Sequence, residues 1–375
     1  MNRLSSSVTA LVIMVVVPIG CALFFVSLLH EGLPLRVPAS VVDLDHSAMS
    51  REVIRALNAT ELVDICKRDE SYAQAMSAVK SGEIFGFFVI PEDFEKNAVG
   101  GNTPTLEYYT NMTYFVPGTL SFKGFKTIAV STAGSVASAK LEAVGLTSET
   151  ISPLVQPVVI DSVGIGNPWI NYSYYLTPSF TFGCLGLIIM IFTVYTITVE
   201  IKHGTSVDWL SQAGGSINVA LAGKLLPQTV IYIVVSLCIE AILFRYLHFP
   251  MSGALGWLLL ATAIFVPACQ SFAVMVSCLL PNPRLALSVV SLFGILTFSF
   301  AGFSFPVEKM YGAIAIFSYL SPVRYLFLIY INQALNGFDV YYVRYYFVAL
   351  LLFLYAGMLF TSRLKKMCLR PVYVP

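Results

Sequence analysis

Near its start the chain reads Val8-Thr-Ala-Leu-Val-Ile-Met-Val-Val-Val-Pro-Ile-Gly-Cys-Ala-Leu-Phe-Phe-Val-Ser-Leu-Leu29, a run that contains no charged residue. A helix needs about 20 apolar residues to cross the hydrocarbon core of a bilayer, so this run predicts a membrane-spanning helix. A cleaved secretory leader is the alternative. The run exceeds the usual apolar region of a leader, and no A-x-A-like cleavage site follows it. We therefore expect an uncleaved anchor.

The composition indicates that lipid surrounds much of this protein. Of its 375 residues, 57% are hydrophobic and only 11% are charged, and the mean hydropathy is +0.77. Soluble domains carry about 25% charged residues, so a chain this apolar would aggregate in water. The net charge of +1 gives no basis for a polyanionic partner, and we expect no nucleic-acid binding.

Five further apolar segments follow the first. Together the six predict a mainly α-helical membrane protein with six transmembrane helices. The six segments cover residues 8–29, 176–199, 221–244, 255–280, 285–304 and 343–361. An even number of crossings puts both ends of the chain on one side of the membrane.

Basic residues predict which side that is. The side with the termini holds eight Lys and Arg, and the short loops opposite hold four. The eight are Arg3, Lys202, Lys224, Arg284, Arg363, Lys365, Lys366 and Arg370, and the four are Arg245, Lys309, Arg324 and Arg344. Short cytoplasmic loops carry the excess of Lys and Arg, so we expect both termini in the cytoplasm.

Charges are concentrated in one part of the chain, because 26 of the 43 acidic and basic residues fall between His30 and Ile170. This shift predicts three parts. The first is residues 1–29, with the first helix. The second is an inserted extracytoplasmic domain at 30–172, and the third is a five-helix transmembrane domain at 173–375.

The inserted domain has the pattern of a small α/β fold. Strand-like runs alternate with helix patterns that Ser47 and Ser71 can cap. The runs cover residues 39–44, 62–65, 86–90 and 106–109. A long helix is expected over residues 119–144, where apolar residues recur at helical spacing. That helix can pack on a partner, on a second copy or on its own domain.

Catalytic patterns are missing from the sequence. It contains no GxSxG, no HExxH and no Walker A motif, because Asn218 stands where a P-loop ending at Gly223-Lys224 needs glycine. No CxxC or Cys/His cluster indicates a metal. We therefore expect a chain that is not an enzyme and that binds neither a metal nor a cofactor.

The predicted loop Glu200-Ile-Lys-His-Gly-Thr-Ser-Val-Asp-Trp-Leu210 lies on the expected cytoplasmic side. Gly204 can end the preceding helix, and Thr205 or Ser206 can cap the next one, with Asp208 in its first turn. We expect a short amphipathic helix here, with Trp209 and Leu210 available to a partner. The alternative is an interfacial helix that rests on lipid.

A broken apolar region precedes the last crossing. Its helices are interrupted at Gly302, Pro306 and Pro322 and are too short to cross the membrane. Irregular backbone at membrane depth is tolerated only inside protein or beside an aqueous cavity. We therefore expect re-entrant helices over 302–335 that shape an exit or gate.

Glu240 lies within the third predicted crossing, one to two turns from its outer end. A carboxylate inside the membrane is a functional candidate by default. The alternative is an interfacial residue that pairs with Arg245 or reaches water.

Four stretches, in this order and spacing, resemble the permease subunit of type-2 ABC exporters, in the subgroup with a large external domain between the first and second transmembrane helices. They are Val37-Pro38-Ala-Ser-Val-Val-Asp43-Leu-Asp45-His-Ser47, Gly166-Asn167-Pro168-Trp-Ile-Asn-Tyr-Ser-Tyr174, the coupling-helix motif of Glu200 with Gly204-Thr205 and Trp209-Leu210, and the re-entrant signature of Gly302 to Pro306 with Ser321-Pro322. The resemblance covers nearly the whole chain. The sequence departs from the family pattern at Lys202-His203, where a pair of more strongly acidic and basic residues is expected after Glu200.

This resemblance implies a multi-pass protein of the bacterial inner membrane that exports a drug-like, lipid or glycan substrate. It implies a second permease copy, as a homodimer or related heterodimer, and two copies of a separate ABC ATPase that holds ATP and Mg. Residues 200–212 would form the coupling helix to that ATPase. Membrane lipid and a periplasmic adaptor are further expected partners.

Two other functions stay open from the residues alone. A secondary transporter would need coupled ionisable groups inside the bundle, for which Glu240 is the one basis, and it commonly shows inverted repeats. A membrane receptor or scaffold with an external binding domain has the same outline. It would not need an ATPase-facing loop.

The charge pattern makes a direct prediction of topology. Cysteine introduced at Lys202 or Lys365 should be protected from an impermeant thiol reagent in intact cells, whereas cysteine at Asp93 should react. The reason is that the excess of basic residues keeps its side of the protein in the cytoplasm. Labelling at position 202 without labelling at position 93 would show that the predicted orientation is wrong.

Overall fold

The computed structural model describes residues 8–32, 35–100, 102–156, 165–280 and 282–371. By its internal contacts the chain divides into two compact units. The membrane unit comprises Met1–Gly32 and Gly164–Pro375, and the inserted unit comprises Leu33–Val163. Arg3, one of the eight basic residues used for orientation, lies outside the described residues.

Six helical segments of the membrane unit are long and apolar enough to cross a bilayer, by length and composition. All six predicted crossings are therefore confirmed as long apolar helices. In chain order they are α2 (Val8–Leu11) with η1 (Val12–Val16) and α3 (Val17–Leu28), α9 (Tyr172–Lys202), α11 (Ile217–Glu240) with η2 (Ala241–Tyr246), α12 (Leu255–Leu279), α13 (Pro283–Phe300), and α16 (Val340–Ala356) with η5 (Met358–Phe360) and α17 (Thr361–Leu369).

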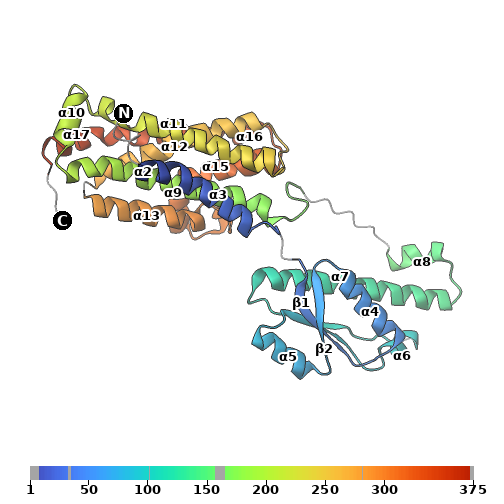
Figure 1. Ribbon diagram of the computed structural model, residues 1–375. Helices are drawn as coiled ribbons and strands as arrows, with labels where there is room; N and C mark the ends of the chain where they lie inside the picture. The colour runs from blue at the N-terminus through green and yellow to red at the C-terminus, as the bar shows by residue number, and fades with distance from the viewer. Residues whose placement is uncertain (1–7, 33–34, 101, 157–164, 281, 372–375) are drawn as a thin grey trace. The chain divides into compact units, whose positions relative to one another are not determined.

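The central helices of this unit are α9 and α12. Their most apolar windows are 67% and 61% buried, whereas the other four windows are between 17% and 33% buried. Helix α9 packs against α3, α12, α13 and α15 (Pro322–Tyr330), as Figure 1 shows. The outer helices thus keep broad apolar faces that suit lipid or another membrane protein.

Small residues allow α9 and α13 to approach each other closely. A Cβ atom on Gly294 of α13 would lie 2.3 Å from Cδ1 of Leu187, and one on Gly183 of α9 would lie 2.9 Å from the ring of Phe298. Without a hydrophobic driving force between helices in lipid, such close packing is a main source of their association.

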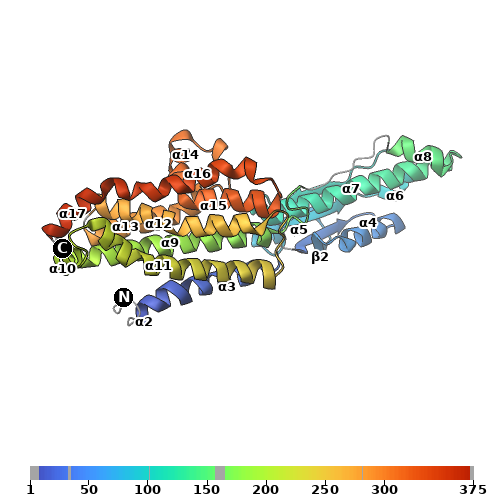
Figure 2. The same ribbon diagram turned by 90° about the horizontal axis from the view of Figure 1, so that it is seen from above.

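The chain between α13 and α16 is bent and partly helical. It forms η3 (Val307–Lys309), α14 (Gly312–Tyr319), α15 and η4 (Ile331–Leu335). Helix α14 meets the continuous segment Pro322–Leu335 at a bend of 82°, and Figure 2 shows α14 at the edge of the bundle. The predicted crossing over 285–304 was too long, since α13 ends at Phe300 and Gly302 has a φ of +98° that stops a helix.

The stretch 166–174 contains the start of α9 and bonds to the chain just after the first crossing. The amide of Tyr172 donates to the carbonyl of Gly32 at 2.8 Å, and the side chain of Asn171 caps α9 by accepting from the amides of Ser173 and Tyr174. Asn167 and Asn171 exchange two further hydrogen bonds. Residues 165–172 therefore pack with the membrane unit.

The inserted unit contains a four-stranded sheet of order β2-β1-β3-β4. Strand β1 runs parallel to β2 and β3, and β4 is antiparallel to β3. The strands are β1 (Val37–Asp43), β2 (Val63–Asp69), β3 (Gly86–Ile90) and β4 (Glu107–Thr110). Each overlaps a run that predicted it, although β2 continues four residues past the predicted end at Ile65, to Asp69.

Helices cover both faces of this sheet. Side chains of a strand alternate between its faces, so neighbouring residues of one strand pack against different helices. Val41 and Phe88 pack with α4 (Ala48–Ala59) and α7 (Phe115–Ala143) on one face, and Val42 and Phe87 pack with α5 (Tyr72–Ser81) on the other. Ser47 and Ser71 cap α4 and α5 as predicted.

The long helix of the inserted unit is α7. It begins four residues before the predicted start and packs on its own sheet through Phe125 and Ile128, which is one of the three alternatives that the sequence left open. Two short helices, α6 (Phe94–Val99) and α8 (Ser148–Val155), were not predicted. Each is too short for a clear apolar period.

We predict that residues 33–163 fold without the membrane unit and that Phe125 is central to their stability. Phe125 is fully buried, so Phe125→Ala should reduce the free energy of unfolding by about 3–5 kcal/mol. Phe122 on the same helix is 38% exposed, and Phe122→Ala should cost under about 1 kcal/mol. Denaturant unfolding of the purified fragment measures both. A random-coil spectrum, or equal losses, would contradict this.

Candidate functional site

The turn from α9 to α11 forms an elbow, which we define as residues 200–224. Helix α9 ends at Lys202, Gly204 takes a φ of +69°, and the short helix α10 (Ser206–Gln212) follows. A left-handed residue directly after a helix is typical of a glycine stop. The predicted helix break at Gly204 and the predicted short helix are both observed.

Glu200 ties the two ends of the elbow together. Its Oε1 atom lies 2.5 Å from Nζ of Lys224 on α11, and its Oε2 atom accepts a hydrogen bond from the hydroxyl of Thr205. The side chains of Glu200 and Lys224 are only 19% and 14% exposed, so water screens this pair less than a surface pair. The carboxylate therefore fixes the path of the chain between α9, α10 and α11.

The capping role predicted for Thr205 or Ser206 was wrong. Thr205 occupies the N-cap position of α10 but makes no side-chain cap, because its hydroxyl bonds to Glu200 instead. Ser206 is buried and donates to the carbonyl of Cys368 at 2.9 Å. Both hydroxyls thus attach α10 to neighbouring helices rather than to its own first turn.

The prediction that Leu210 is available to a partner was also wrong. Leu210 is 2% exposed and packs in a cluster with residues of α9, α11, α12 and α17, including Cys278 and Cys368. Trp209 is half-buried beside the same cluster, and Nζ of Lys224 lies 4.7 Å from the centre of its ring. A cation over an indole face is attracted by the ring, so Trp209 also supports the elbow.

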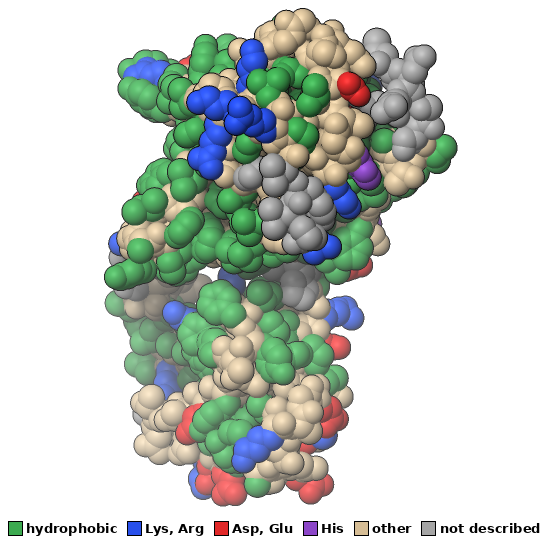
Figure 3. All heavy atoms as spheres, turned by 90° about the vertical axis from the view of Figure 1, so that its left-hand side faces the viewer, with side chains coloured by type: hydrophobic (Ala, Val, Ile, Leu, Met, Phe, Trp, Pro, Cys, Tyr) green, Lys and Arg blue, Asp and Glu red, His purple; other side chains and the backbone are tan. Residues whose placement is uncertain are grey.

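The outward face of α10 is polar except for Val207. Val207, Asp208, Ser211 and Gln212 are exposed on it. Around α10 lies a basic end of the membrane unit, and Figure 3 shows Lys and Arg gathered over this face. Its exposed basic residues are Lys202, Arg284, Arg363, Lys365, Lys366 and Arg370.

A second cluster forms around Arg324 in the broken region. Arg324 is 5% exposed, and its guanidinium donates to the carbonyl of Ala301, lies 3.6 Å from the carboxylate of Glu308 and stacks over Tyr319. An added Cβ on Gly302 would lie 3.4 Å from Nη1 of Arg324. Sequence reasoning had used Arg324 only as a loop charge.

The other residues predicted for the gate have separate surroundings. Ser321 is buried and shares a hydrogen bond with Thr297 of α13, and Pro322 begins α15 at a position where its missing N–H costs nothing. Pro306 is exposed before the turn at Val307–Lys309. Gly302, Ser321 and Pro322 thus lie close to Arg324 in the chain or in space.

Glu240 is buried inside the membrane unit. It is 1% exposed, and its Oε1 atom accepts a hydrogen bond of 2.6 Å from the hydroxyl of Thr262 on α12. Its Oε2 atom has no partner among the described residues. The alternatives of pairing with Arg245 or reaching water were wrong, since no ion pair joins these two residues in the described part of the chain.

Sequence reasoning missed that Glu240 ends a buried polar row on α11. Gln228, Tyr232, Ser236 and Glu240 follow one another at intervals of four, and each is at most 1% exposed. Residues four apart lie on one face of a helix, so this spacing within an apolar helix was the available signal. Gln228 bonds to Thr196 of α9, which shows that the row faces the interior.

A model of the ABC-2 family transporter proteins matches residues 9–362, nearly the whole chain. The chain therefore belongs to the ABC-2 transporter family, a family of membrane transporter components that generally lack an ATPase site of their own. A search of curated proteins finds no match.

Membership of this family gives the described geometry a context. It favours a transporter over the receptor or scaffold alternative, and it implies an associated ABC ATPase. In the described residues no group of three or more His, Cys, Asp or Glu side chains is arranged to hold a metal ion.

We predict that Leu210 seals the cluster behind α10. Cys278 and Cys368 are fully buried with it, so in a protein whose other five cysteines are replaced, both should resist a membrane-permeant maleimide. Leu210→Ala should increase the labelling rate of both, because the truncation opens a cavity beside them. Val207→Ala, on the exposed face of α10, is the control and should change nothing. Equal rates in all three proteins would contradict the packing.

Proposed function

We propose that this chain is the permease subunit of an ATP-driven exporter whose ATP is hydrolysed by a separate subunit. The elbow is the observation that carries the proposal. It presents a short, braced helix at a basic end of the membrane unit, and its inner face is fixed to four helices by Glu200, Ser206 and Leu210. Such a helix can transmit a displacement, because it cannot move without moving α9 and α11.

The surface of α10 favours a protein partner over lipid. An interfacial helix buries an apolar face in the headgroup region. In α10 the apolar Leu210 already packs inside the chain, and three of the four outward residues are polar, namely Asp208, Ser211 and Gln212, with Val207 the fourth. We propose that this face and Lys202 contact the ATPase, while Glu200, Gly204, Thr205 and Trp209 hold the helix in place.

We propose further that two permease copies and two ATPase subunits form the working complex in a bacterial inner membrane. In four of the six long helices at most 33% of the apolar window is buried, which leaves room for a homodimer or heterodimer contact beside lipid. The basic end would face the cytoplasm, because basic residues accumulate there. ATP and Mg would bind the ATPase, and the inserted unit would face outward, where an adaptor can reach it.

The exported substrate is proposed to be drug-like, lipid or glycan in class. The region 302–335, with Gly302, Pro306, Ser321 and Pro322, is proposed as the exit gate. The support is its bend of 82° and the buried guanidinium of Arg324 at the turn. An irregular segment of this kind is tolerated in a membrane where protein surrounds it.

Two variants should separate contact with the ATPase from transmission through the elbow. Val207→Asp puts a charge on the exposed face of α10 and should weaken ATPase binding by about thirtyfold, the effect of losing an interface contact worth about 2 kcal/mol. Glu200→Ala removes the brace, so the ATPase should still bind while stimulated hydrolysis and transport fall. Trp209→Ala should resemble Glu200→Ala.

Ser362→Asp is the matched control, because Ser362 is exposed on α17 near the same end. It should leave ATPase binding and stimulation unchanged. The measurements are co-purification of the ATPase and ATP hydrolysis in proteoliposomes. Full stimulation and transport in a Val207→Asp, Glu200→Ala double variant would reject the coupling role of the elbow.

A further inference from the structure

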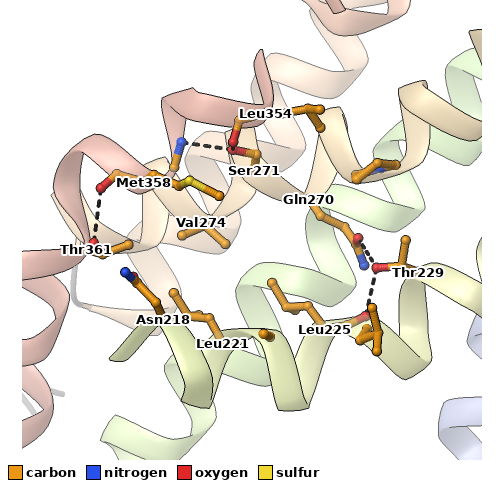
Figure 4. A pocket seen from close by; sticks show the side chains of 14 residues that line it. Asn218, Leu221, Leu225, Thr229, Gln270, Ser271, Val274, Leu354, Met358 and Thr361 are labelled. Carbon is orange, nitrogen blue, oxygen red and sulfur yellow. Dashed lines mark hydrogen bonds between the residues drawn. The ribbon is translucent and has the colours of Figure 1, made fainter. Parts of the chain in front are cut away.

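A cavity of about 440 Å³ lies between α11, α12 and the region where α16 gives way to α17 (Figure 4). Its volume is within the roughly 300–1,000 Å³ of small-molecule sites. Its walls are lined by Asn218, Leu221, Ala222, Leu225, Leu226, Thr229, Pro267, Gln270, Ser271, Val274, Leu354, Gly357, Met358 and Thr361. None of these side chains carries a charge.

A break in the last crossing helps to form this cavity. Helix α16 ends at Ala356, and a tight turn over Met358–Phe360 precedes α17. The hydroxyl of Ser271 on α12 donates to the carbonyl of Leu354 and accepts from the amide of Gly357, both at 2.9 Å. These bonds satisfy backbone groups that the break releases, so they attach the broken helix to α12.

Gln270 gives the cavity one deep polar group. It is 3% exposed, its Oε1 atom accepts a bond of 2.6 Å from the hydroxyl of Thr229, and its Nε2 atom has no partner among the described residues. If the amide is turned over, Nε2 donates to the hydroxyl oxygen of Thr229, and that hydroxyl donates instead to the carbonyl of Leu225. The Oε1 atom of Gln270 then has no partner. Either orientation leaves one amide atom without a hydrogen-bond partner.

The depth of Gln270 distinguishes between possible ligands. It lies nine residues before the end of α12 at Leu279, which is about 14 Å along a helix. The headgroup of a phospholipid stays at the membrane surface, and its acyl chain has no atom that can bond to an amide at this depth. A charged ligand would find no opposite charge in the walls and would bear the full cost of desolvation.

We propose that this cavity binds a compact, uncharged, mostly apolar molecule with one hydroxyl group, which bonds to the side chain of Gln270. A hydroxyl both donates and accepts, so it satisfies Gln270 in either amide orientation. The apolar remainder contacts Leu221, Leu225 and Val274. The site lies within a single chain and therefore does not depend on a dimer or on an ATPase.

The test uses a matched pair of photoreactive probes in proteoliposomes, dodecanol and dodecane, each with a diazirine in its chain. Mass spectrometry locates the labelled residues in the full-length protein. The alcohol should label residues 218–229 and 354–361, unlabelled dodecanol should displace it, and the alkane should label these segments far less.

Three variants sharpen this result. Gln270→Leu removes the amide at similar size and should reduce alcohol labelling by roughly three- to tenfold, the effect of one lost hydrogen bond. Ala222→Phe fills the cavity from an exposed position and should also reduce labelling, even if Gln270→Leu disturbs folding. Val219→Phe is the control, because Val219 is exposed on α11 outside the cavity.

Unchanged alcohol labelling in Ala222→Phe would overturn the proposal. Equal labelling by alcohol and alkane in the unaltered protein would also overturn it, because the cavity would then hold ordinary membrane lipid without the aid of Gln270.

Discussion

Inside a bilayer, each polar group must find its partner within the protein, because lipid offers none. This constraint accounts for most of the membrane unit. The backbone forms long helices, and the places where helices break are repaired by side chains. Ser271 bonds to both sides of the break at Gly357, and Asn171 caps α9 where the chain enters the bundle. The buried guanidinium of Arg324 bonds to the carbonyl left free after α13.

The same constraint draws attention to the polar atoms that remain unsatisfied. Glu240 and Gln270 each have one buried side-chain atom without a partner in the described part of the chain. A soluble protein can bring water to such groups, whereas a membrane-spanning helix can do so only where a cavity opens beside it. Gln270 lines such a cavity, which is why it supports a ligand and Glu240 by itself does not.

In the elbow, residues of the predicted coupling motif pack within the chain. Trp209 and Leu210 were expected to be available to another protein and Thr205 to cap the helix, yet these residues and Glu200 contact their own chain. The residues of α10 that stay exposed are Val207, Asp208, Ser211 and Gln212. A coupling helix needs both kinds of residue, since a contact transmits motion only if the helix that carries it is held firmly to the rest of the bundle.

The sequence by itself determined that this is a membrane protein, the six long helices, the strands of the inserted unit and the two serine caps that begin α4 and α5. These follow from apolar length and period and from local hydrogen bonds, which depend on residues close together in the chain. Tertiary structure alone decided that Lys224 pairs with Glu200, that Ser206 bonds to Cys368 and that Leu210 is buried. It also placed Gln270 beside a cavity formed by three separate segments. Those partners lie far apart in sequence, and one apolar helix face resembles another until packing brings particular residues together.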